Sequence, residues 1–241
     1  MRGGDAKTPA MLRLFPLKTV LFPGAVLAVR VFEPRYRQMV GDALRSGEGF
    51  GVVLIRDGDE AGDPDVVPHA IGTTAEIDDV TVLDGGRYAL NATGRRRFRI
   101  DRIVSREPYL LAEATFLTDD VADAAARVRL DEIRDVFREY LGLLIAFSGV
   151  RAELDLPEDP LDASYLIGDA LQVADAMKQR LLELRSAEER LGVELGFLRA
   201  LLPRLRALLE RTTDVDEEPE EPAEPARATQ ERLFGSYFSR N

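Results

Sequence analysis

The sequence predicts an α+β protein: a small β-barrel or sandwich with one interrupting helix, then an α-helical bundle or hairpin, then a disordered acidic tail. Three observations lead to this prediction. Short apolar segments of alternating polarity dominate residues 11–117. Over residues 118–211 the apolar residues instead recur every three or four positions. Residues 212–241 combine proline with a run of like charges and an aromatic tip.

The predicted strands are short and are bounded by clusters of Gly, Pro or Asp. They cover residues 51–55, 79–83, 87–93, 97–104 and 109–116. Within the third of these, Tyr88 and Leu90 alternate with polar neighbours, which is typical of a sheet with one solvated face. Gly85 and Gly86 predict a tight hairpin turn, because glycine adopts positive φ without strain. Many short strands at close spacing favour a small barrel or a sandwich.

One helix interrupts the strands. Pro34 suits a first helical turn, where its missing N–H would have no partner in any case. Apolar residues at helical spacing carry the helix to a stop at Ser46 and Gly47. Glu33 is placed to cap its N-terminus, where a carboxylate meets free N–H groups and the positive end of the helix dipole. Tyr36 falls on the apolar side, so we expect it in the core.

Three helices are predicted in the second half of the chain. The first follows Asp119 and turns one apolar stripe inward: Val128, Ile133, Val136, Phe137, Tyr140, Leu144 and Phe147. The segment 156–163 is a hinge, and the second helix begins at Ser164 and runs without a break to residue 184. Ser186 and Glu189 form a capping box for the third helix, which Pro203 should kink.

The tail is predicted to be disordered because it has few apolar residues to bury and carries proline and like charge. Its tip differs, since Leu233, Phe234, Tyr237 and Phe238 lie close together. Docking onto the parent domain or fraying is the interpretation favoured for this tip, with a partner-binding motif as the alternative.

The composition excludes several classes of function. The chain has no cysteine, and His69 is its only histidine, which excludes disulfides, thiolate zinc sites, cysteine nucleophiles and multi-histidine metal sites. The phosphate-binding loop, the dinucleotide-binding fingerprint, the zincin motif and the nucleophile elbow are all absent. We therefore expect a protein that is not an enzyme, with no cofactor, no metal and no catalytic residue.

The net charge of −11 lies in the second half of the chain. Residues 1–117 carry 16 basic and 16 acidic side chains, and residues 118–241 carry 16 and 27. Proteins that bind nucleic acid usually present a basic field, so nucleic acid is not an expected partner. The N-terminus lacks a signal-peptide pattern, and no apolar run approaches the roughly 20 residues of a membrane span. We expect a cytoplasmic protein without membrane contact.

GRRRFRI, residues 94–100, is the one basic cluster. One interpretation is an RNA or phosphate contact through Arg95, Arg96 and Arg97, with Phe98 stacking on a base. Strand alternation favours another interpretation, in which Arg97 and the arginine two residues later share the solvated face and Phe98 points into the core.

Other charged residues fall where apolar ones are expected. Arg35 and Arg37 flank Tyr36, and we expect them to be partners in buried ion pairs rather than ligand contacts. Lys178, one of only three lysines, falls inside the apolar arc of the second predicted helix. Such a lysine snorkels, pairs with a carboxylate or lines a groove. Our hypothesis is that Lys178 anchors the helices to the β-domain through an acid such as Glu33.

The most specific pattern of the sequence is FPLxxVLFPG, Phe15 to Gly24, followed by VFEPRYRxM, Val31 to Met39. Further matching segments are IGTTAEI, EPYLLAE, MKQRLLE and RLGVEL, at 71–77, 107–113, 177–183 and 190–195. Together they closely resemble the N-terminal substrate-binding domain of the Lon protease family, over about residues 11–210. The chain looks most like the small stand-alone proteins built from that domain without the ATPase and protease modules.

The resemblance implies a PUA-like β-barrel followed by a helical extension. In full-length members this domain helps to bind polypeptide substrates, which implies a non-catalytic module for peptide recognition, an adaptor in protein quality control. An edge strand of the barrel is the expected binding surface. The partners would be unfolded or extended polypeptides, with a protease or a chaperone, or a second copy in a weak homo-oligomer. RNA binding by the same barrel is the alternative, and a hydrolase with an unmarked site ranks third.

Overall fold

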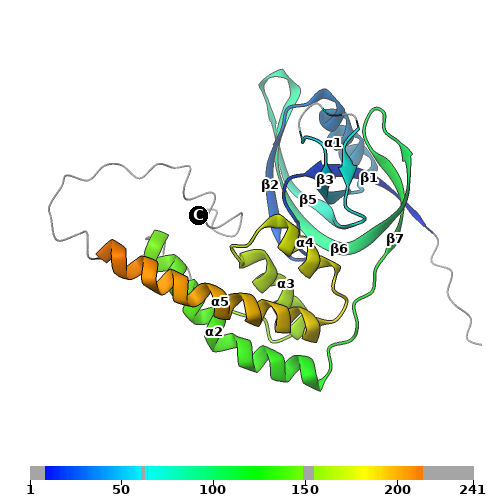
Figure 1. Cartoon of the computed structure of the whole chain (residues 1–241). Coiled ribbons are helices and arrows are strands. Elements are labelled where there is room, and N and C mark those ends of the chain that lie inside the picture. Colours follow the sequence, from blue (N-terminus) through cyan, green and yellow to red (C-terminus); the bar gives the residue numbers. More distant parts are fainter. Residues whose placement is uncertain (1–8, 61–62, 64, 149–154, 214–241) are drawn as a thin grey trace, which may run out of the picture. The chain divides into compact units, whose positions relative to one another are not determined.

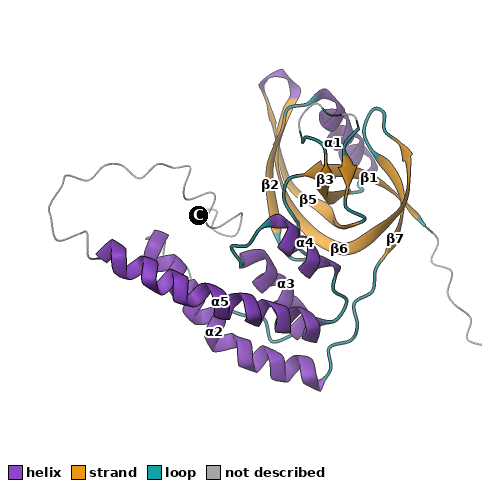
Figure 2. Ribbon diagram, viewed as in Figure 1, coloured by secondary structure: helices purple, strands orange, loops and turns teal. Residues whose placement is uncertain are grey.

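The computed structural model describes residues 9–60, 63, 65–148 and 155–213. The chain divides into two compact units, one built mainly of strands and one of helices (Figures 1 and 2). The first unit comprises Met1–Asp119 and Val173–Glu183, and the second comprises Asp120–Gln172 and Leu184–Asn241. The predicted boundary between residues 117 and 118 stays a prediction. The first unit, however, includes a segment that we expected among the helices.

The first unit contains one mixed sheet of seven strands. The strands are β1 (Ala10–Leu17), β2 (Val26–Val31), β3 (Phe50–Asp57), β4 (Val67–Pro68), β5 (Ile71–Leu83), β6 (Arg87–Ser105) and β7 (Leu111–Phe116). Their order is β1-β7-β6-β5-β3-β4, and β2 pairs with β6. Because β1 also pairs with β3 in parallel, the pairings form a closed circuit through five strands. Two helices complete the unit, α1 (Pro34–Ser46) and α4 (Asp175–Glu183).

Each predicted strand range overlaps a strand of the structure, but the range 79–83 covers only the end of β5, and one connection was wrong. Residues 87–93 and 97–104 belong to one continuous strand, β6, of 19 residues. Gly94 in its middle lies under the turn of the FPG motif: Gly94 N donates to Ala25 O and Gly24 N donates to Gly94 O, both at 2.8 Å. A Cβ atom at residue 94 would lie 2.2 Å from Phe22 O, so only glycine allows this close approach.

The local signals for the turn and the first helix were correct. A short 3-10 turn, η1 (Asp84–Gly86), joins β5 to β6, with positive φ at Gly85 and Gly86. Helix α1 begins at Pro34 and ends before Gly47, which has a left-handed conformation. The helix buries one face, consisting of Tyr36, Met39, Val40 and Ala43. Inside the sheet, a cluster of buried residues forms the core: Leu14, Val53, Val66, Phe98, Leu110, Ala112 and Ala114.

The continuous helix predicted from Ser164 is wrong. Two helices occupy this stretch, α3 (Pro160–Ala170) in the second unit and α4 in the first. Helix α3 starts early because Asp159 caps it, accepting hydrogen bonds from Leu161 N and Asp162 N. It stops where buried Leu171 takes an extended conformation. Helix α4 then packs on the sheet, where Gln179 Nε2 donates to Ile71 O at 3.0 Å.

The second unit consists of α2 (Ala124–Ser148), α3 and α5 (Ala187–Thr213). Four of the predicted core residues of α2 are buried: Ile133, Phe137, Tyr140 and Leu144. Val128 is 59% exposed, contrary to prediction. The buried stripe instead passes through Ala126 and Leu130. Val128 is two positions from each of them, and residues two positions apart lie on nearly opposite sides of a helix.

The serine half of the predicted capping box is confirmed, because Glu189 N donates to Ser186 Oγ at 3.3 Å. Helix α5 extends on both sides of Pro203, and the predicted kink stays a prediction. The predicted disordered tail and its aromatic tip lie outside the described residues. Over the described ranges, no helix is long and apolar enough to cross a membrane.

Candidate functional site

β2 is a free edge of the sheet in the first unit. Among the described strands it pairs only with β6, in antiparallel register from Val26–Thr93 to Val31–Tyr88. Figure 1 shows β2 at the margin of the sheet. The side of β2 away from β6 therefore carries backbone N–H and C=O groups that no described strand pairs, which is the feature that accepts an additional strand.

The side chains of β2 give this edge two different faces. Leu27 and Val31 are buried and Val29 is half-buried, so one face is apolar. Ala28 and Arg30 on the other face are exposed. No carboxylate of the described residues forms an ion pair with Arg30. An added strand would therefore meet aliphatic side chains on one face and an available guanidinium on the other.

Two other edges of the sheet carry features that discourage strand pairing. β5 pairs with β3 only at Thr73–Ala75, and beyond that point β5 carries the exposed acids Glu76, Asp78 and Asp79. A register shift also interrupts β5 at residues 77–79. β4 has two residues, one of them a proline. Charges, bulges and proline are the usual protection of sheet edges. β2 has no acid, no proline and no register shift. Of the three edges it is therefore the one best suited to accept an added strand.

The predicted signature residues before and within α1 are mostly structural. Glu33 is the N-cap residue of α1, but the prediction that its carboxylate caps the helix is wrong, because no side-chain cap bond forms. The carboxylate instead accepts a hydrogen bond from Arg35 Nε at 3.0 Å. Tyr36 lies in the core as predicted, with its ring centroid 4.6 Å from that of Phe15. Burial raises the pKa of Tyr36 to about 12, so its hydroxyl is neutral at physiological pH.

The two arginines of this segment have different partners. Arg35 forms an ion pair, as predicted, and its partner is Glu33; its Nη1 also donates to Asp63 O at 2.8 Å. Arg37 bonds a carbonyl rather than the predicted carboxylate: its Nη1 donates to Gly85 O. Arg37 thereby links α1 to the turn between β5 and β6. Both residues hold the fold together and leave the β2 edge free.

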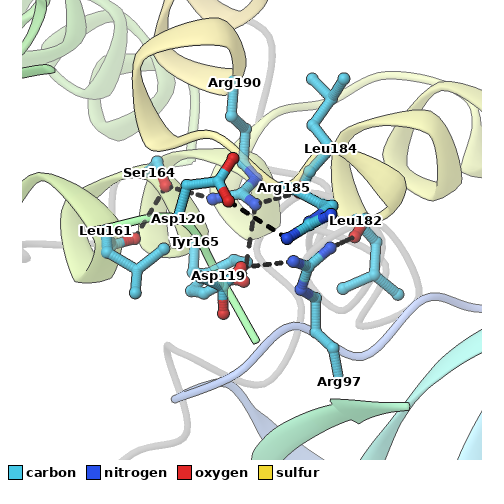
Figure 3. Close-up of polar contacts among 10 residues, drawn as sticks. All are labelled: Arg97, Asp119, Asp120, Leu161, Ser164, Tyr165, Leu182, Leu184, Arg185 and Arg190. Carbon is cyan, nitrogen blue, oxygen red and sulfur yellow. Dashed lines mark hydrogen bonds and ion pairs between the residues drawn. The ribbon is translucent and has the colours of Figure 1, made fainter. Parts of the chain in front are cut away.

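Arg97 is the main correction to the sequence-based prediction. It is 1% exposed rather than solvated. Its Nη1 donates to Leu182 O at 2.6 Å, and its Nη2 forms an ion pair with the carboxylate of Asp119 (Figure 3). Thr73, which is aligned with Arg97 on β5, is also completely buried. Helix α4, 85 residues further along the chain, covers this face of the sheet.

The rest of the basic cluster is locally neutralised. Arg95 Nε donates to Glu76 at 2.7 Å, and Arg99, which is solvated as predicted, pairs with Asp101 at 2.9 Å. The guanidinium of Arg96 lies 4.2 Å from the centroid of the Phe116 ring. Phe98 is buried in the core, as predicted, so it is not placed to stack on a base. The cluster therefore offers little basic field to a nucleic acid.

Lys178 lies on α4 and is half-buried. Burial raises the pKa of Asp175, three residues earlier, while the positive charge of Lys178 lowers it by less. The carboxylate of Glu33 bonds Arg35, and the predicted link between Lys178 and Glu33 stays a prediction.

Two buried charged residues of the second unit were not predicted. Arg190 on α5 is completely buried, and its Nη1 donates to Ser164 Oγ at 2.7 Å while its Nη2 donates to Leu184 O (Figure 3). Its guanidinium also lies 4.1 Å from the centroid of the Tyr165 ring. Glu194, one turn later, is completely buried as well. Their four-residue spacing inside the apolar run of α5 is a signal that could have identified them.

The carboxylate of Glu194 is buried without a hydrogen-bond donor among the described residues. Neither of its carboxylate oxygens accepts a hydrogen bond from the described residues. Burial raises the pKa of Glu194 well above its ordinary value, and the nearby charge of Arg190 only partly opposes this. His69, the only histidine, lies 3.9 Å from Glu183. Over the described residues, no group of three potential ligands is arranged to hold a metal. The free edge of β2 is therefore the strongest candidate site, and it is suited to binding.

Comparisons with known proteins agree with a binding role. Residues 11–200 match the model of the ATP-dependent protease La (LON) substrate-binding domain. The Lon protease of Flavobacterium johnsoniae is 28% identical over 216 residues, which cover 83% of this chain and 25% of that protein. The Lon protease of Anaeromyxobacter dehalogenans is 29% identical over 216 residues, with 86% and 25% covered. The chain thus spans about a quarter of the length of these relatives.

Two solved structures resemble this chain. The first is the crystal structure of a Lon N-terminal domain protein from Xanthomonas campestris, with a TM-score of 0.58 and 29% identity. The match covers 78% of this chain and 98% of that protein. The second is the N-terminal domain of Mycobacterium avium complex Lon protease, with a TM-score of 0.58 at 20% identity, which shows a shared fold.

Proposed function

The chain belongs to the family of Lon substrate-binding domains, and from that premise we propose that it is a non-catalytic module that recognises extended or unfolded polypeptides. The family match over residues 11–200 is the observation that carries this proposal. The free edge of β2 supplies a surface with the required chemistry.

Binding would occur by addition of a strand to β2. Backbone hydrogen bonds along this six-residue edge give affinity that depends little on the client's sequence. The half-buried side chain of Val29 then favours aliphatic or aromatic side chains on the same face of the client. Folded proteins have few unpaired strands to offer, so unfolded chains are preferred. Because one short edge binds weakly, avidity from assembly or from a second partner would strengthen the interaction.

Several finer features belong to this proposal. The closed circuit of strand pairings supports a PUA-like barrel. The sequence has no phosphate-binding loop, so we assign neither ATP hydrolysis nor proteolysis to it. An adaptor in protein quality control would deliver its client to a protease or a chaperone, and a weak homo-oligomer would supply the avidity. The neutralised arginines of β6 give no support to RNA binding.

The first prediction tests the edge with Val29→Lys in the full chain. An inward-pointing lysine on an edge strand opposes the addition of another strand. We expect at least a tenfold loss of affinity, about 1.4 kcal/mol, for fluorescently labelled, reduced and carboxymethylated lactalbumin. Fluorescence anisotropy measures this affinity, and the thermal unfolding midpoint verifies that the variant is folded.

The matched control is Val82→Lys, because Val82 is 69% exposed on β5, away from the β2 edge. It should bind the unfolded probe within about twofold of the wild type, as a surface substitution away from the edge. Equal binding of folded and unfolded lactalbumin by the wild type would contradict the proposed function. Equal losses in a folded Val29→Lys and in Val82→Lys would instead remove β2 from the mechanism.

A further inference from the structure

We infer that the β2 edge selects client segments in which one acidic residue stands between two aliphatic residues. The inference rests on the proposed function, because it names the class of polypeptide that the same edge takes. Arg30 is then the residue that determines specificity, since backbone hydrogen bonds alone would accept almost any extended sequence.

Arg30 faces no acid on the strand that pairs with β2. It lies on the exposed face of β2, directly opposite Ala89 of β6. By the same register, its two diagonal neighbours on β6 are Asn91 and Arg87. None of these three is an acid, and no carboxylate of the described residues forms an ion pair with Arg30. The open side of β2 is therefore where a strand can supply the acid that β6 lacks.

Elsewhere in the sheet, arginines are neutralised from a neighbouring strand. Arg102 of β6 lies opposite Glu113 of β7 and forms an ion pair with it. Arg95 of β6 donates a hydrogen bond to Glu76 of β5 at 2.7 Å. Cross-strand pairs of opposite charge stabilise a sheet, whereas like charges directly opposite each other destabilise it. A strand added to β2 completes the same type of pair when its acid lies beside Arg30.

The other face of β2 determines the residues that flank this acid. Val29 and Val31 adjoin Arg30 in the sequence, so their side chains lie on the opposite face of the strand. Val31 is buried, and Val29, which lies opposite the buried Leu90 of β6, is half-buried. When a client's acid lies beside Arg30, its two neighbours lie beside these valines, where aliphatic side chains are favoured. The order aliphatic–acid–aliphatic reads the same in both directions, so it applies to parallel and to antiparallel addition.

The second prediction compares fluorescein-labelled peptides, bound to the full chain and measured by fluorescence anisotropy. SKTVEVTVKS has the inferred order, and SKTVQVTVKS has glutamine in place of the acid. The isomer SKTEVVTVKS has the composition of the first peptide, but its acid is flanked by threonine on one side. The first peptide should bind about three- to fivefold more tightly than either of the others, because only it satisfies both faces of β2. The net charge of −11 favours the glutamine peptide, so the expected order reports a local partner.

A charge exchange assigns this partner. Arg30→Glu should reverse the preference, so that SKTVKVTVKS binds about three- to fivefold more tightly than the glutamate peptide. A purely structural effect of residue 30 would not produce such a reversal. Arg56→Glu is the matched control, because Arg56 of β3 is exposed, forms no ion pair with the described residues and gives the same change in net charge. It should keep the wild-type preference, and thermal unfolding midpoints verify that both variants are folded.

The outcomes separate this inference from the proposed function. Suppose that carboxymethylated lactalbumin binds, but the glutamate peptide binds no better than the glutamine peptide or the isomer. That result would overturn the inference and leave the proposed function standing. A preference that persists in Arg30→Glu, or that is lost equally in Arg56→Glu, would overturn the inference as well. The expected order of peptides without any binding of lactalbumin would support the inference and contradict recognition of unfolded chains, and binding of no probe would overturn both.

Discussion

Among the described residues, three side chains of the charged types lie completely or almost completely out of water: Arg97, Arg190 and Glu194. Removing a charged group from water is costly unless hydrogen bonds and opposite charges replace its hydration. The two arginines have such partners, because each donates to a main-chain carbonyl and to a side-chain oxygen. Glu194 does not, because its oxygens accept no hydrogen bond from the described residues. Substituting a buried arginine should therefore lower the free energy of unfolding, whereas substituting Glu194 should raise it.

The third prediction concerns Arg97→Met. The substitution leaves Leu182 O and the Asp119 carboxylate without their buried donor, so the free energy of unfolding should fall by about 3 to 5 kcal/mol. Urea unfolding followed by circular dichroism measures the loss. Arg99→Met removes an exposed ion pair two residues away and should cost less than about 1 kcal/mol. A similar small cost for both variants would contradict the role given to Arg97.

The fourth prediction concerns Glu194→Met and pH. Burial raises the pKa of Glu194 in the folded state, so folding favours the protonated form. In the unfolded chain this carboxyl ionises at its ordinary pKa. The group therefore destabilises the fold progressively as pH rises from the ordinary pKa of glutamate towards the raised one. Methionine removes both the charge and the unsatisfied oxygens.

The variant should be more stable than the wild type by about 1 to 3 kcal/mol at pH 8, with a clearly smaller gain at pH 4. Urea midpoints at pH 4, 6 and 8 test this. Glu132→Met is the control, because Glu132 is exposed and paired with Arg129, and it should show no gain that grows with pH. A gain in Glu194→Met that is the same at all three pH values would show that ionisation is not the cause.

At the scale of elements, β6 depends on the glycine in its middle. The fifth prediction is that Gly94→Ala destabilises the protein by about 1 to 3 kcal/mol, because its Cβ would overlap with Phe22 O and force the backbone to move. Gly41→Ala in α1 is the control in the same unit. Its Cβ would meet the flexible Arg45 side chain at 3.4 Å, and helix propensity favours alanine, so it should be neutral or stabilising. Chemical denaturation compares the two.

Elements with local signals could be predicted from the sequence, and elements that depend on distant contacts could not. Pro34 and Gly47 bound α1, Gly85 and Gly86 form the turn, and Ser186 caps α5, each through neighbouring residues. The burial of Arg97 depends on α4, 85 residues away. Period-two alternation assigns one face of a strand to solvent and carries no information about a helix that later covers that face.

The candidate site likewise has one part that could be predicted from local sequence signals and one part that depends on distant contacts. The family could be identified from the residues between Phe15 and Met39, because their motifs are specific. The free edge of β2 could not, because which strand lacks a neighbour is decided by pairings between distant segments. Glu33 illustrates the difference: it was placed correctly at the helix start, but its preferred partner, Arg35, was not evident from the cap pattern.

At the scale of the whole molecule, charge is distributed unequally. Over residues 1–117 the basic and acidic side chains are equal in number, and many of them pair with each other, as Arg95 does with Glu76 and Arg102 with Glu113. The acidic excess lies in the remainder, most densely in residues 214–232. A molecule with this distribution has no excess of basic charge in either half of its sequence.

The first unit is discontinuous in sequence, since it is completed by Val173–Glu183 after the chain has passed through much of the second unit. On the ribosome, the sheet is therefore synthesised before the helix that covers Arg97. At the usual rates of translation, roughly 3 to 13 s separate residue 119 from residue 183. During this interval the β-sheet of a nascent chain lacks its α4 cover, and Arg97 lacks the Leu182 carbonyl. A nascent chain that stops before residue 173 has all seven strands but lacks α4, so the first unit cannot be separated from the second by a single cut.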